Sequence, residues 1–176
     1  MALQLLEKYL LIQFLKCYPR VALEELNLLA GRLRNMASAH DVAAYILKKL
    51  GPMTAMKLQK LVYYCQAWSL VWDEKPLFQE EIQAWANGPV VRELYDRHKG
   101  QYTVHAWDGS PDVFGREELE TIEGVLAFYG DKTSYWLSDL THRESPWLEA
   151  RQGLSPGERG ENIISHASMM EYYSSL

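Results

Sequence analysis

Residues 54–72 read TAMKLQKLVYYCQAWSLVW and carry the longest helical pattern in the chain. Thr54 is a typical helix N-cap, and Met53 and Leu58 occupy the two positions of a hydrophobic staple. The side chains that recur at helical spacing predict one buried face, made of Leu58, Leu61, Val62, Cys65, Trp68, Ser69 and Trp72. The adjacent stripe is expected to be more exposed and contains Lys57, Lys60, Tyr64 and Ala67. We therefore predict a long helix that ends at residues 73–76.

Further helices are predicted on both sides of this one. Ser38, with Asp41 three positions on, forms a capping-box pattern for a helix that stops at Gly51-Pro52. Downstream, apolar spacing predicts helices over about 117–129 and 133–142, and another beginning at Ser145-Pro146. A closing helix is expected to contain Ile163, Ile164, Ala167 and Met170.

The period of the pattern changes between residues 77 and 107. Residues 80–86 alternate and predict a short strand, and residues 102–107 predict a second one that pairs with it. Pro89 follows Gly88 and is predicted to be the first residue of a helix carrying Val90, Val91 and Leu94. The expected fold class is mainly α (α+β): a compact helical domain with a two- or three-stranded antiparallel β element.

The first 36 residues differ from the rest in charge and are predicted to be an N-terminal helical extension of a domain formed by residues 37–176. They hold five bases and three acids, so their net charge of +2 leaves −7 for the remainder of a chain whose total is −5. A domain this acidic is poorly suited to a phosphate backbone. A DNA-binding regulator acting through residues 1–35 stays open as an alternative.

The two cysteines, Cys17 and Cys65, lie in apolar helical patterns and form no CxxC motif. With no signal peptide in the sequence, they predict a reducing, cytoplasmic setting. The apolar run at residues 5–17 is short and interrupted by charges, so it predicts an amphipathic helix and no membrane span.

Motifs of catalysis and cofactor binding are lacking. The histidines are scattered, and the triplet from His142 to Glu144 lacks the PCxxC that accompanies it in zinc deaminases. No nucleotide-binding or acyl-transfer motif occurs, and Cys65 is expected to be a core thiol. We expect no enzyme activity, cofactor or metal. The rival hypothesis is a catalytic or ligand-binding pocket around Trp85, Asn87, His98, His142 and Glu144.

Three blocks of sequence carry a resemblance to a known family. They are TAMKLQKLVYYCQAW (54–68), PLF (76–78) leading to IQAWANGPVV (82–91), and LSDLTH (137–142) with Glu144, Pro146 and Trp147. In order and spacing they resemble the Panacea domain of SocA-like antitoxins of bacteria and phages, from about residue 38 to the C-terminus. The resemblance implies a mostly helical, non-enzymatic protein that neutralises a toxin encoded nearby by direct contact. Some family members instead deliver the toxin to a protease, which is the alternative function.

A neutraliser needs an exposed apolar or aromatic patch for its partner. The candidate contact residues are Leu6, Leu10 and Phe14 in the extension and Tyr64, Asn87, Arg92, Tyr95, His142 and Glu144 in the main domain. The extension is a candidate for choosing the partner, completing the interface or forming a homo-oligomer. The acidic domain would favour a basic toxin. The stretch AWANGPVVRELY (84–95) is interpreted mainly as a scaffold corner from which Asn87 and Arg92 reach a partner.

Overall fold

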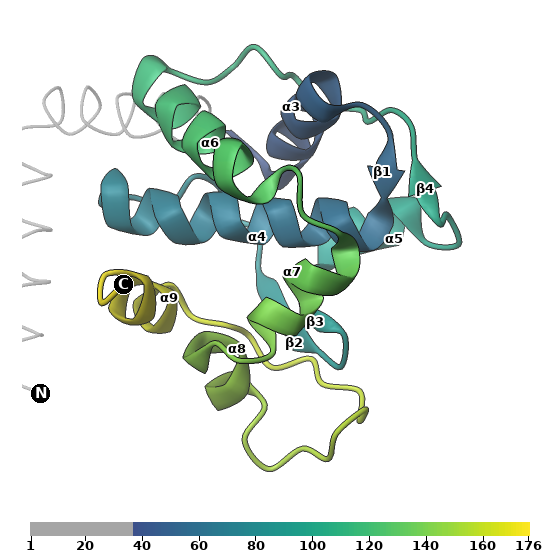
Figure 1. Ribbon diagram of the computed structural model, residues 1–176, viewed down its shortest axis with the longest axis vertical. Helices are drawn as coiled ribbons and strands as arrows, with labels where there is room; N and C mark the ends of the chain where they lie inside the picture. Colours follow the sequence, from purple (N-terminus) through teal and green to yellow (C-terminus); the bar gives the residue numbers. More distant parts are fainter. Residues whose placement is uncertain (1–36) are drawn as a thin grey trace, which may run out of the picture. The chain divides into compact units, whose positions relative to one another are not determined.

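The computed structural model describes residues 37–176, which form a mainly helical domain with two small antiparallel sheets (Figure 1). The predicted fold class is therefore confirmed. The predicted extension, with its candidate residues Leu6, Leu10 and Phe14, lies outside the described residues. Among the described helices, none is long and apolar enough to cross a membrane.

The elements follow one another as short helices around one long one. The helices are α3 (Ala39–Leu50), α4 (Ala55–Trp72), α5 (Arg92–His98), α6 (Arg116–Tyr129), α7 (Ser134–Thr141), α8 (Ser145–Ala150) and α9 (His166–Tyr173). The strands are β1 (Met53–Thr54), β2 (Ile82–Trp85), β3 (Gly88–Val91) and β4 (Thr103–Val104).

Helix α4 runs through the middle of the domain and packs against α3 and α6 on one side and against α9, α7 and β3 on others (Figure 1). Thr54 caps it, since its hydroxyl accepts a hydrogen bond from the Lys57 amide at 3.2 Å, as predicted. The expectation of one buried face is wrong. Lys60 is 1% exposed and Tyr64 0%, because neighbours cover the second stripe as well, whereas Trp72 at the C-terminal end is 51% exposed. A helix that is covered on several sides is a core helix.

The other helical predictions hold, with shifts at the ends. Ser38 and Asp41 form the predicted capping box at the start of α3. Helix α8 begins at Ser145, but Glu144 is its N-cap. Helix α9 begins only at His166, so placing Ile163 and Ile164 in a helix was wrong. The amide of Ile164 instead donates to the carbonyl of Ile82 at 2.8 Å, which places residues 162–164 alongside β2.

The stretch AWANGPVVRELY forms a β-hairpin followed by a helix, so the prediction that Pro89 begins a helix is wrong. Strands β2 and β3 pair from Ile82↔Val91 to Trp85↔Gly88, and Ala86-Asn87 forms the turn. Proline, which has no amide hydrogen, is tolerated here because of its partner in the register, Ala84. The amide of Ala84 points away from β3 and donates to the carbonyl of Asn162. Pro89 therefore lies where β3 needs no donor toward β2. Helix α5 starts three residues later, at Arg92.

The predicted strand at 102–107 exists only as β4, and its predicted partner was wrong. Strand β4 pairs with β1, in the register Met53↔Val104 and Thr54↔Thr103. Met53 and the N-cap residue Thr54 have an extended backbone, so β1 offers a free edge with which β4 can pair. The hairpin β2–β3 supplies its own partner strand, so it does not need β4.

Candidate binding pocket

Two polar side chains of α4 hold the outer edge of the hairpin. The side-chain amide of Gln59 accepts a hydrogen bond from the Val91 amide at 2.8 Å and donates to the Val91 carbonyl at 3.2 Å. The ammonium group of Lys60 donates to the Pro89 carbonyl at 3.0 Å. An exposed strand edge leaves backbone groups unpaired. Gln59 and Lys60 therefore form hydrogen bonds with the backbone at the edge of β3, as a neighbouring strand would, and fix β3 on α4.

Glycine is required at position 88 by this arrangement. Gly88 has a φ of +100°, and a Cβ there would lie 2.7 Å from Lys60 Cε and 2.8 Å from Thr141 Oγ1. Both distances are too short for a real contact, so a side chain would push Lys60 and α7 away. The close approach of the hairpin backbone to α4 and α7 thus depends on Gly88.

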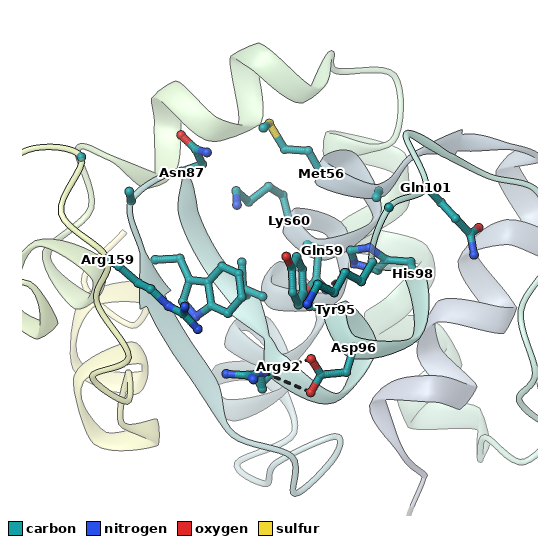
Figure 2. Close-up of a pocket in the computed structure, with 17 residues that line it drawn as sticks. Met56, Gln59, Lys60, Asn87, Arg92, Tyr95, Asp96, His98, Gln101 and Arg159 are labelled. Atoms are coloured by element: carbon teal, nitrogen blue, oxygen red, sulfur yellow. Dashed lines mark hydrogen bonds and ion pairs between the residues drawn. The ribbon is translucent and has the colours of Figure 1, made fainter.

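A pocket of about 510 Å³ opens between the hairpin, the start of α4, helix α5 and the loop at residues 157–159 (Figure 2). Lys60 is buried, Trp85, Arg92 and Tyr95 are half-buried, and Asn87 is exposed. Lys60 therefore lies at the inner end of the pocket and Asn87 at its mouth. The volume is within the range of small-molecule sites, about 300–1,000 Å³.

Aromatic and cationic side chains form one wall. The rings of Trp85 and Tyr95 meet edge to face with centroids 4.5 Å apart. The guanidinium carbons of Arg92 and Arg159 each lie 5.9 Å from the Trp85 ring centroid, within the range of cation–π contacts. Glu161 links the two arginines, at 3.7 Å from Arg92 and 2.8 Å from Arg159.

The loop that carries Arg159 is held in place by Arg151, which is buried. Its guanidinium donates to the carbonyl of Ala84 in β2 at 2.9 Å and to the carbonyls of Ser155 and Glu158 at 3.2 Å and 2.8 Å. These bonds tie the loop to the hairpin. Arg151 therefore positions Arg159 at the pocket without lining it.

The pocket is electropositive although the described domain is acidic. Four basic residues line it (Lys60, Arg92, Lys99 and Arg159) against one acid, Asp96. Burial lowers the pKa of Lys60 to about 7, with no carboxylate near enough to oppose the shift. Burial also lowers the pKa of His98, whose Nε2 lies 2.9 Å from the Gln59 amide nitrogen and accepts its hydrogen bond. A neutral His98 is consistent with the predicted structural role.

The structure brings three of the candidate contact residues together. Asn87, Arg92 and Tyr95 all line the pocket, and so do Trp85 and His98 of the rival hypothesis. His142 does not line it: the ring stacks on Trp147 at 4.3 Å between centroids. In turn, the Trp147 indole donates to the Trp85 carbonyl at 2.9 Å, so this pair supports the hairpin from behind.

Tyr64 and Glu144 lie in the interior, so in the folded domain they have no surface to offer a partner. Glu144 accepts hydrogen bonds from the hydroxyls of Tyr173 at 2.7 Å and Tyr64 at 3.2 Å. Burial raises the pKa of Glu144 to about 7, and the two hydroxyls lower it in part. These hydrogen bonds link Glu144, at the start of α8, to Tyr64 of α4 and Tyr173 of α9, which is a structural position. Cys65 is fully buried, as predicted, and burial raises its thiol pKa.

The sequence interpretation missed Gln59, Lys60 and Arg159. A signal for the first two was present, because amide and ammonium side chains stand inside a helix that is otherwise rich in apolar residues. Arg159 carried no such signal. It lies in a Gly/Pro/Ser loop, and only the contacts of Arg151 show where that loop is held.

A second cluster has the composition of a metal site. Ligand atoms of His40, Glu80 and Glu93 lie within 4.8 Å of one another. However, the indole of Trp107 donates to His40 Nδ1 at 3.1 Å, so the proton of a neutral ring is on Nε2. Both nitrogens are then engaged or protonated. Metal binding would require the Trp107 hydrogen bond to break, and the residues present do not fit a preformed site.

The described residues form a small helical domain with a pocket between the hairpin, α4 and α5. A comparison with protein families identifies the family of this domain. The family model described as "Antitoxin SocA-like, Panacea domain" matches residues 58–148. The chain belongs to this family. The match is shorter at both ends than the resemblance from residue 38 onward, and it leaves out Arg159. Searches of the curated proteins and of the solved structures found no match.

Proposed function

We propose that this protein neutralises a cognate toxin by binding it directly, in the cytoplasm and without catalysing a reaction. Membership of the SocA-like antitoxin family, over residues 58–148, is the observation that carries this proposal. The family implies a toxin partner in general. Direct contact is the mode that the surface of the domain supports best.

The mouth of the pocket is the proposed contact region. Trp, Tyr and Arg are the residue types that most often dominate binding energy at protein interfaces. Trp85, Tyr95, Arg92 and Arg159 gather there, with the exposed Asn87 at the tip of the hairpin. The side chains are braced by one another and by Glu161, so binding would immobilise little that is free.

Co-expression with the product of the adjacent reading frame tests the proposal. The adjacent product alone should stop growth of a bacterial host, and the full chain should restore growth and co-purify with it. A harmless product, or rescue without co-purification, would contradict direct neutralisation.

The same assay separates direct binding from delivery to a protease. In hosts that lack the ATP-dependent cytoplasmic proteases, a direct binder should still rescue growth fully. An adaptor should fail there, and the toxin level should fall only in hosts that retain the proteases.

A further inference from the structure

We infer that the pocket between β2–β3, α4 and α5 is a binding site for a small organic anion, one with a flat apolar body and a single carboxylate or phosphate group. This inference does not depend on toxin binding. It rests on the shape of the pocket, on the chemistry of its wall and on the unusual position of Lys60.

The wall suits the apolar body of such a ligand. Trp85 and Tyr95 present two aromatic surfaces that are half-buried, and the exposed side chain of Met56 borders the same space from the first turn of α4 (Figure 2). Aromatic rings and a thioether bind flat apolar groups well. Pockets with a mostly apolar lining and a few convergent polar groups are typical small-molecule sites.

The anionic group would face Lys60. Lys60 is 1% exposed, and its ammonium group has one hydrogen bond, to the Pro89 carbonyl, although an ammonium carries three donors. No carboxylate pairs with it in the ion pairs formed within residues 37–176, so its charged form is buried without compensation. A buried cation is costly unless it is paired. An anion entering the pocket would supply the missing partner.

The two arginines of the pocket, Arg92 and Arg159, already form ion pairs with carboxylates. Glu161 lies between Arg92 and Arg159, and Asp96 pairs with Arg92 at 3.0 Å. Each guanidinium has five donors, so donors remain for a ligand. Glu161 would compete with an incoming anion for the same groups. The pocket therefore has one cation that is both buried and unpaired, Lys60, and two arginines whose shared acidic partner, Glu161, can be removed by mutation.

The test uses the full chain and defined probes. Phenylacetate and phenyl phosphate carry the proposed anions, and phenylacetamide and phenethylamine are their neutral and cationic counterparts. Binding is followed by two-dimensional NMR through the indole N–H signal of Trp85, which Trp85→Phe assigns. The anions should give saturable shifts at up to about 10 mM, with affinities about tenfold above those of the neutral and cationic probes. Which anion binds more tightly identifies the head group.

Charge variants locate the site. Glu161→Gln should raise the affinity for the anions several-fold, because it removes the carboxylate that Arg92 and Arg159 share. Arg159→Gln should lower it about tenfold, and Lys60→Met should remove the preference for anions. Arg116→Gln, on the exposed surface of α6, is the matched control and should change nothing. Glu161→Gln and Arg159→Gln alter exposed side chains, so they remain informative if Lys60→Met fails to fold.

Three results with the free chain would overturn the inference. They are the absence of saturable shifts with either anion, equal affinity for phenylacetamide, and unchanged anion affinity in both Glu161→Gln and Arg159→Gln. A fourth result, obtained with the toxin, would also overturn it. Phenylacetate would bind the free chain but be excluded from the chain saturated with its toxin, and the toxin would lose affinity when one of its carboxylates is removed. The anion would then belong to the toxin, and the assignment of a free ligand would be wrong. None of these results bears on whether the chain rescues growth.

Discussion

The ammonium nitrogen of Lys60 lies 3.0 Å from the carbonyl oxygen of Pro89, and this contact joins the central helix to the hairpin at the pocket. The lysine is enclosed by the domain and has no carboxylate beside it, so burial alone lowers its pKa to about 7. A single helix residue thus supports the strand edge and gives the pocket its inner charge.

Lys60 should make the stability of the protein depend on pH on the alkaline side of neutrality. Near pH 8 the unfolded chain keeps the proton on this lysine, whose ordinary pKa is 10.5, whereas the folded chain has released it. The unfolded state then binds more protons, so the free energy of unfolding rises with pH, by about 1.4 kcal/mol per unit. Urea unfolding between about pH 7.5 and 8.5 measures this slope.

Lys60→Met should remove that slope, and Lys99→Met, at the exposed end of α5, should keep it. The window ends near pH 8.5 because the buried thiol of Cys65, with its raised pKa, destabilises the folded state once the unfolded thiol ionises. Parallel curves for the protein and Lys60→Met would show that Lys60 is charged throughout in the folded state.

Glu144 should act in the opposite direction below neutrality. Its folded pKa is about 7, above the ordinary 4.5, so between these values the folded state holds a proton that the unfolded state has lost. The contribution of Glu144 to stability should therefore fall as pH rises from about 5 to 6.5, by about 1.4 kcal/mol per unit. The lowered pKa values of His98, His142 and His166 work against this fall, and they are unchanged in Glu144→Gln. The difference between the two unfolding curves should isolate Glu144, and a constant difference would refute its raised pKa.

Gly88→Ala should destabilise the domain by about 3 kcal/mol, because the new Cβ meets Lys60 and Thr141 in addition to the strain of a positive φ. Gly153→Ala is the matched control. Its φ is +85°, but no atom lies within 4 Å of the added Cβ, so about 1 kcal/mol is expected. Chemical denaturation of both variants measures the difference. Equal losses would mean that the hairpin does not press against α4 and α7.

Tyr95→Ala and Arg92→Ala should each weaken the toxin complex by about tenfold or more, because they remove the aromatic and cationic side chains at the pocket mouth. Arg116→Ala, on α6, should leave the affinity unchanged. Calorimetric titration gives the affinities, and the melting temperature of each free variant shows whether folding is intact. Wild-type affinity in both pocket variants would move the contact surface elsewhere.

The sequence predicted the helices well because their signals are local. Thr54 and Ser38 cap helices through their own neighbours, and the apolar spacing of α6 does not depend on distant contacts. The prediction that a helix begins at Pro89 is wrong for the same reason. A proline after a glycine is typical of a helix start, and only the register with Ala84 and the edge partners on α4 show that it lies in a strand.

The pocket was only partly predictable. Asn87, Arg92 and Tyr95 were chosen from one stretch, and helix α5 brings two of them to the mouth. The prediction that Tyr64 is exposed rests on a helix with one buried face, whereas α4 is covered on several sides. Arg159 reaches the pocket through a loop held by Arg151. The guanidinium of Arg151 donates to the carbonyl of Ala84, which lies 67 positions away in the sequence. No local pattern reports a contact of that range.

Calorimetric titration of the purified toxin into the purified full chain tests direct neutralisation most closely. We predict a saturable one-to-one complex with a dissociation constant below about 1 μM, and loss of toxin activity in proportion to the complex formed. Saturation with full toxin activity, or the absence of binding by a chain that still rescues growth, would contradict it.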